Sequence, residues 1–131
     1  MRQPNSYARG ELVVVVDCAD LGRAAEFWTA VLGYADGGGG DTYRSLLPAD
    51  GAGAEVLLQR TADAKQGKNR LHLDLRTRDL DAEVRRVTEL GARRQTAEPL
   101  REHGWTWHVL EDPDGNEFCV ILPPPEYWAR S

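Results

Sequence analysis

The same sequence pattern occurs twice in this chain. In each copy a short apolar run leads through an Asp-Leu pair into a helical pattern that stops at Leu-Gly. The first copy runs from Leu12 to Gly33 and the second from Leu71 to Gly91. In a chain of 131 residues, these two copies and the strands expected after them account for most of the sequence. Because each half is too small to bury a sheet alone, the halves are expected to use each other, with the functional site where they meet.

Composition excludes several classes of function. The chain is 41% hydrophobic and 28% charged, which is ordinary for one compact domain. Its formal net charge of −5, with basic pairs such as Arg85-Arg86 set among glutamates, argues against a nucleic-acid or membrane surface. The early apolar run from Leu12 to Val16 is too short for a signal or membrane segment, which predicts a cytoplasmic protein.

The first half predicts one amphipathic helix and several strands. Asp17 and Asp20 offer N-cap carboxylates, and apolar residues then recur at helical spacing from Leu21 to a stop at Gly33. Gly37 to Gly40 indicates a flexible hairpin tip. Strands are expected at Val13 to Val16, which should be buried, and at Thr42 to Leu47 and Glu55 to Arg60.

The second half repeats this order. A strand at Leu71 to Arg76 precedes a helix from about Asp79 to Leu90, with Leu80, Val84 and Val87 facing inward. Strands follow near Trp105 to Leu110 and Glu117 to Leu122, joined by a tight turn at Asp112 to Gly115. Weak strands are expected around Gln95 to Pro99 and before Thr42, and Pro123 to Pro125 should end the regular structure.

These elements predict an α+β fold of tandem βαβββ modules. Their curved mixed sheets would form a cleft, with the helices packed on the outside. The chain would be one domain of residues 1–131. Its parts would be a loose arm at 1–10, module one at about 11–60, a connector at 61–69, module two at about 70–122 and a tail at 123–131.

Alternation along the strands selects candidate site residues. Leu71, Leu73 and Leu75 share one face and should cover the helices, whereas His72, Asp74 and Arg76 share the other. The same parity groups Glu117, Cys119 and Ile121 on the last strand, and Glu55, Leu57 and Gln59 on the fourth. A cleft with this lining suits a metal or a polar small molecule.

Several of these residues have more than one interpretation. His72 could be a neutral imidazole hydrogen-bonded to Asp74 or to a neighbouring strand, a metal ligand, or a metal-free group for binding or proton transfer. Trp105 and Trp107 share a strand face, where they could stack on a planar ligand or simply fill the core. Cys18 and Cys119 form no disulfide framework, and His103 and His108 are expected in a turn and on a strand face without chemistry. Tyr127-Trp128 could fold back over an apolar groove or a partner subunit.

The pattern resembles the vicinal oxygen chelate superfamily, which includes glyoxalase I, extradiol dioxygenases, fosfomycin-resistance enzymes and bleomycin-resistance proteins. The resemblance rests on the repeated βαβββ plan, the stretch from Asp20-Leu21 to Tyr34, the histidine-bearing strand and Asp112-Pro113-Asp114-Gly115-Asn116. More narrowly, the segments Lys68 to Leu75 and Asn116 to Val120 resemble a glyoxalase-like subgroup.

The resemblance implies a set of metal-ligand positions, of which this chain has suitable residues at only some. Metal-using members place ligands on the first, fourth, fifth and eighth strands. The fifth-strand histidine corresponds to His72, but the first-strand ligand corresponds to Val13, which cannot bind a metal. The eighth-strand glutamate corresponds to Cys119, with Glu117 two residues earlier on the same face. The fourth-strand position corresponds to Gln59 or Leu58.

Three functional hypotheses follow. The first is a homodimer that binds a small, partly aromatic molecule in the cleft between its modules, without the family's full metal site. Its contacts would come from Gln59, His72, Asp74, Trp105, Trp107 and Cys119. The second is a lyase, isomerase or dioxygenase in which His72 and Glu117 are catalytic and hold one divalent ion: Zn, Ni, Mn or Fe. The third is a structural domain with a vestigial cleft.

Overall fold

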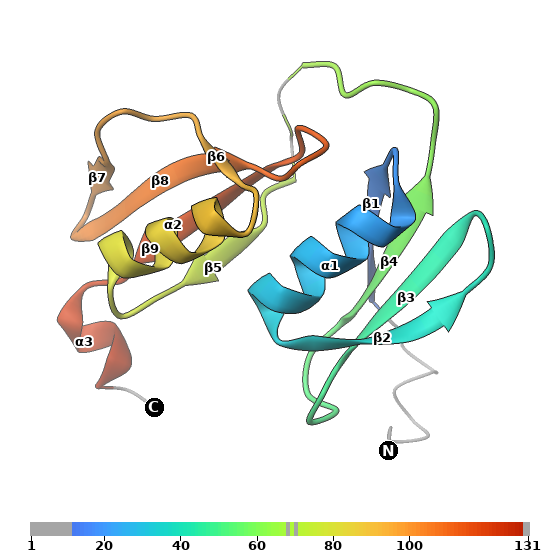
Figure 1. The fold of residues 1–131 in the computed structure, drawn as a ribbon. Helices are drawn as coiled ribbons and strands as arrows, with labels where there is room; N and C mark the ends of the chain where they lie inside the picture. Colours follow the sequence, from blue (N-terminus) through green and yellow to red (C-terminus); the bar gives the residue numbers. More distant parts are fainter. Residues whose placement is uncertain (1–11, 68, 70, 130–131) are drawn as a thin grey trace. The chain divides into compact units, whose positions relative to one another are not determined.

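The computed structural model describes residues 12–67, 69 and 71–129, and it divides into two compact units, Met1–Ala64 and Lys65–Ser131 (Figure 1). The boundary between these units lies within the connector expected at 61–69. The loose arm expected at residues 1–10 lies outside the described residues. Among the residues described, no helix has the length and apolar character needed to cross a membrane.

The first unit is a βαβββ module with a mixed sheet. Its strands are hydrogen-bonded in the order β1-β4-β3-β2; β1 runs parallel to β4, and the other neighbours are antiparallel. The elements are β1 (Val13–Cys18), α1 (Leu21–Leu32), β2 (Tyr34–Gly39), β3 (Tyr43–Pro48) and β4 (Glu55–Arg60).

The second unit repeats this plan with one strand interrupted. Its elements are β5 (Asp74–Arg76), α2 (Leu80–Glu89), β6 (Arg93–Arg94), β7 (Leu100–Glu102), β8 (Trp105–Glu111), β9 (Glu117–Leu122) and α3 (Pro125–Trp128). The sheet order is β5-β9-β8-β6, and β7 also pairs with β8. Because β9 occupies one edge of β8, β6 and β7 share the other edge and together take the place that β2 has in the first unit. The predicted α+β fold class, built on repeated βαβββ modules, is confirmed.

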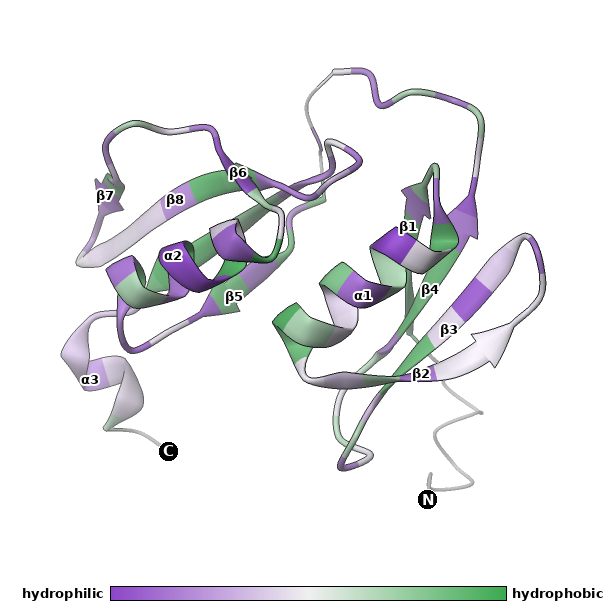
Figure 2. Cartoon of the chain, viewed as in Figure 1, coloured by the Kyte–Doolittle hydropathy of each residue, from purple (hydrophilic) through white to green (hydrophobic). Residues whose placement is uncertain are grey.

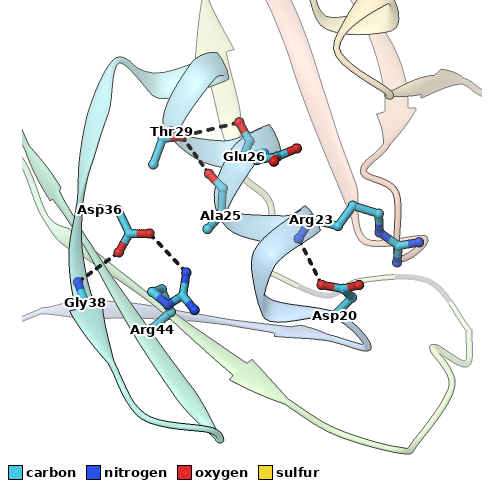
Figure 3. Close-up of polar contacts among 8 residues, drawn as sticks. All are labelled: Asp20, Arg23, Ala25, Glu26, Thr29, Asp36, Gly38 and Arg44. Carbon is cyan, nitrogen blue, oxygen red and sulfur yellow. Dashed lines mark hydrogen bonds and ion pairs between the residues drawn. The ribbon is translucent and has the colours of Figure 1, made fainter.

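Helix α1 begins and ends where the sequence predicts. The Asp20 carboxylate accepts a hydrogen bond from the Arg23 backbone N–H at 3.0 Å, so Asp20 rather than Asp17 is the N-cap (Figure 3). At the other end Gly33 adopts a left-handed conformation with φ of 71°. The buried residues of the helix are Leu21, Ala24, Ala25, Phe27, Trp28 and Val31, and the last helical residue, Leu32, is half-buried.

Helix α2 buries Leu80, Val84 and Val87, as predicted. It packs mainly on β9, β8 and β6, above a core that includes Leu110, Phe118 and Val120. Figure 2 shows hydrophilic residues interspersed with hydrophobic ones along the helix, as expected for one exposed and one buried face. On the exposed face, hydrogen bonds from Arg86 hold the pKa of Glu83 below its usual value.

The strand predicted to carry His72 is shorter than expected and begins after that residue. It begins at Asp74 instead of Leu71, and Leu71 is 88% exposed rather than packed on a helix. Pairing with β9 begins only at Asp74 and Cys119, and the Glu117 carbonyl oxygen bonds to the Asn69 side chain instead. Because Leu71 and His72 lie outside the strand, strand alternation does not determine where they point.

The glycine-rich segment is a strand and not only a hairpin tip. Gly37, Gly38 and Gly39 belong to β2, which pairs with β3 through an irregularity between Asp36 and Gly38. At Gly39, with φ of 157°, an added Cβ would collide with the Tyr43 carbonyl oxygen, so glycine is needed for the close approach. The Asp36 carboxylate accepts a hydrogen bond from the Gly38 N–H and pairs with Arg44 (Figure 3).

Two further expectations were wrong. Strand β1 is not wholly buried, because Val15 is 52% exposed on the sheet face opposite to Val16. Regular structure also continues beyond the prolines, because Pro125 begins the short helix α3. Proline suits the first position of a helix, where its missing N–H would have no helical partner.

Candidate functional site

Strand register places the predicted polar residues on one face of the second unit's sheet. Asp74 lies beside Cys119, and Cys119 beside Val109. In the next row, Ile121 of β9 lies beside Trp107 of β8. Residues paired in this way point to the same side of a sheet. The opposite side carries buried residues, including Leu110, Phe118 and Val120.

A pocket of about 550 Å³ lies on the exposed face. Six of the residues selected from the sequence line it: His72, Asp74, Trp105, Trp107, Glu117 and Cys119. Its other lining residues are Asn69, Leu71, Leu100, Glu102, His103, Val109, Phe118 and Ile121. The remaining candidate, Gln59, belongs to β4 of the first unit, where its amide donates to the Tyr43 hydroxyl at 3.4 Å.

His72 and Asp74 are exposed at the pocket and are not bonded to each other. Among the described residues, neither side chain has a hydrogen bond or an ion pair. The hypothesis of an imidazole held by Asp74 or a neighbouring strand is therefore not met within the described part of the chain. Both side chains remain accessible to a ligand.

Glu117 joins the connector to β9. One of its carboxylate oxygens, Oε1, accepts a hydrogen bond from the Asn69 backbone N–H at 3.0 Å. The Asn69 side-chain amide in turn donates to the Glu117 carbonyl oxygen, also at 3.0 Å. These two hydrogen bonds tie Asn69, three residues before His72 in the sequence, to the first residue of β9.

The turn before β9 is organised by a buried carboxylate. Asp112 is 1% exposed and accepts hydrogen bonds from the backbone N–H groups of Asp114, at 2.9 Å, and Asn116, at 2.8 Å. It also accepts one from the Asn116 side chain at 3.0 Å. The predicted tight turn is confirmed by the Gly115 N–H donating to the Asp112 carbonyl oxygen, with Gly115 at φ of 86°. The turn sets where Glu117 and Cys119 enter the pocket.

The two pocket tryptophans differ in their surroundings. The ring of Trp105 lies 5.5 Å from that of Tyr127, and the guanidinium carbon of Arg76 lies 5.4 Å from Trp105 and 5.1 Å from Tyr127. Arg76 also donates to the Tyr127 hydroxyl at 2.8 Å. Helix α3 therefore folds back on the second unit, as one sequence hypothesis proposed. Trp107 has no ring or cation contact among the described residues, so its surface is more available for stacking.

Part of the pocket wall, formed by Leu100, Glu102 and His103, was not predicted from the sequence. The weak strand expected around Gln95 to Pro99 was misplaced: that segment is not a strand, and β6 and β7 flank it. Leu100 and Glu102 lie on β7, which pairs with β8. His103 occupies a turn as expected, with φ of 52°, and it also lines the pocket. His108 is buried on a strand, and its Nδ1 lies 2.8 Å from the Thr96 hydroxyl.

The described residues do not assemble the set of metal ligands that the resemblance implies. No three His, Cys, Asp or Glu side chains in the described part of the chain stand close enough together to hold a metal ion. Glu117, one of the two proposed ligands, already uses Oε1 as a hydrogen-bond acceptor. A zinc site normally needs about three protein ligands.

Known protein families and solved structures were compared with this chain, and both support a glyoxalase-like fold. The family model for a glyoxalase-like domain matches residues 13–121. No curated protein sequence matches the chain. The solved structure of the fosfomycin resistance protein FosX from Listeria monocytogenes is similar, with a TM-score of 0.70 and 17% identity, covering 89% of this chain and 95% of that one.

Two other solved structures have comparable similarity. A glyoxalase/bleomycin resistance protein/dioxygenase family enzyme from Burkholderia phytofirmans PsJN has a TM-score of 0.68 and 17% identity, over 84% of this chain and 95% of that one. TioX from Micromonospora sp. ML1 has a TM-score of 0.61 and 19% identity, over 86% of this chain and 98% of that one. At these identities the likeness extends to the fold alone.

Proposed function

The chain belongs to the glyoxalase-like domain family, and from that premise we propose that it binds a small organic molecule in the pocket of its second unit. The observation that carries the proposal is the lining of this pocket. One end offers the accessible polar groups of His72 and Asp74, and the other offers the indole of Trp107 among apolar side chains. A mostly apolar pocket with a few placed polar groups is the usual form of a small-molecule site.

The size of the pocket is consistent with this proposal. Its volume of about 550 Å³ lies within the range of about 300–1,000 Å³ that is usual for small-molecule sites. Cys119, at the centre of the floor between Asp74 and Val109, is a small side chain that leaves room above the sheet. The proposal assigns ligand contact to Trp107, His72, Asp74 and Cys119, and it assigns mainly support of the wall to Trp105.

Replacing Trp107 by leucine tests this assignment. Ligands would first be found by screening aromatic fragments against the wild-type chain by NMR. We expect Trp107→Leu to weaken their binding about tenfold, because an aromatic platform contributes on the order of 1–1.5 kcal/mol beyond its area. Leu90→Ala, which changes an exposed leucine at the end of α2, serves as the control and should leave the affinities unchanged. Fragments that bind Trp107→Leu as tightly as the wild type would count against the proposed site.

The proposal also includes a homodimer. Members of this family often form dimers. Light scattering at micromolar concentration should then return twice the monomer mass of 14.6 kDa. A mass equal to the monomer at that concentration would remove the dimer from the proposal and leave the binding site untouched.

A further inference from the structure

We propose that the ligand of the second unit's pocket is an organic cation with an aromatic ring, its ammonium group at Asp74 and its ring at Trp107. This inference rests on the proposed function, since it names the class of molecule that the same pocket would take. Charge, strand geometry and the accessibility of Asp74 support it separately.

Three carboxylates, Asp74, Glu102 and Glu117, line the pocket together with the imidazoles of His72 and His103. Arg76 has the same strand parity as Asp74, but its guanidinium bonds to the Tyr127 hydroxyl and lies over the rings of Trp105 and Tyr127. The carboxylate of Asp74 can therefore attract a cation at its end of the pocket.

The strand register sets the spacing between the two anchors. Asp74 and Val109 are separated by one intervening strand, which corresponds to about 10 Å across the sheet. Trp107 lies two residues from Val109, or about 7 Å along the strand. Since Asp74, Cys119 and Trp107 line the same pocket, this spacing suits an aromatic ring with a short ammonium-bearing chain.

The accessibility of Asp74 makes it the preferred partner for the cation. Its side chain is exposed and has no ion-pair partner among the described residues, so binding displaces no internal contact there. Glu117 differs, because its Oε1 already accepts the Asn69 N–H. An ammonium group near the indole face of Trp107 would gain a cation–π contribution as well.

A matched set of probes tests the inference on the full chain. The probes are 2-phenylethylamine, 2-phenylethanol and 3-phenylpropanoate, which share a phenyl ring and a short chain but differ in charge. Each would be titrated at neutral pH and low salt while the indole NMR signal of Trp107 is followed. We expect the amine to bind about fivefold more tightly than the alcohol, and the carboxylate to bind most weakly.

The variant Asp74→Asn should abolish the preference for the amine over the alcohol when both are titrated against the variant. Asp81→Asn, on the exposed face of α2, is the matched control and should preserve the preference for the amine. Equal binding of the three probes, or an amine affinity that Asp74→Asn does not lower, would overturn the inference on charge while the proposed pocket stands. If none of the probes shifts the Trp107 signal, both the inference and the proposed function fail.

Discussion

Replacing Asp112 by alanine is expected to lower the free energy of unfolding by about 3 kcal/mol. The substitution removes the acceptor of hydrogen bonds from Asp114 and from the backbone and side chain of Asn116. Because Asp112 is 1% exposed, the donors left behind would not all regain a partner from water. Urea unfolding followed by circular dichroism measures the loss.

The asparagine variant separates the contributions of the two carboxylate oxygens. Asp112→Asn can keep one oxygen for the backbone N–H groups of Asp114 and Asn116, and it loses the acceptor for the Asn116 side chain. Its destabilisation should therefore be about 1 kcal/mol. An Asp112→Ala protein that unfolds at the wild-type urea concentration would show that this turn contributes little to the stability of the hairpin.

Replacing Tyr127 by alanine is expected to cost about 2 kcal/mol of unfolding free energy. Tyr127 contacts the ring of Trp105, lies under the guanidinium of Arg76 and accepts a hydrogen bond from that group. Its loss removes the contacts of α3 with Arg76 of β5 and Trp105 of β8. Thermal unfolding gives the stability change, and a shift in tryptophan fluorescence reports the altered surroundings of Trp105.

Two further variants identify which contact of Tyr127 matters. Tyr127→Phe keeps the ring and removes the hydroxyl, so it should cost about 1 kcal/mol. Glu126→Gln changes an exposed residue of the same helix and should have almost no effect. If Tyr127→Ala is as stable as Glu126→Gln, α3 does not support the pocket wall.

The helices and the main strands could be predicted because their signals are local. Asp20 and Asp79 cap the helices, Gly33 ends the first, and the spacing of Leu80, Val84 and Val87 defines the buried face of the second. Strand parity likewise indicated that Asp74, Glu117 and Cys119 share a face, because a period of two follows directly from strand geometry.

The contacts of the site residues could not be predicted, because their partners are distant in the sequence. Glu117 bonds to Asn69 across 48 positions, and Arg76 bonds to Tyr127 across 51. No local pattern indicates such pairs, so the sequence suggests a catalytic, metal-holding role for Glu117 and gives no partner for Tyr127. The late start of β5 is likewise not encoded in the leucine alternation, because pairing with β9 begins only at Asp74.

The parallel pairing of β5 with β9 also determines when the pocket floor can form during synthesis. Asp74 finds its neighbour only at Cys119, after α2 and the antiparallel strands between them have been made. The β8–β9 hairpin, closed by the Asp112 turn, can form earlier because its contacts are local. Until β5 docks, one edge of β9 is exposed on the nascent chain, and an exposed strand edge can pair with another polypeptide. The second unit is therefore most open to misassembly after the β8–β9 hairpin has formed and before β5 has docked against it.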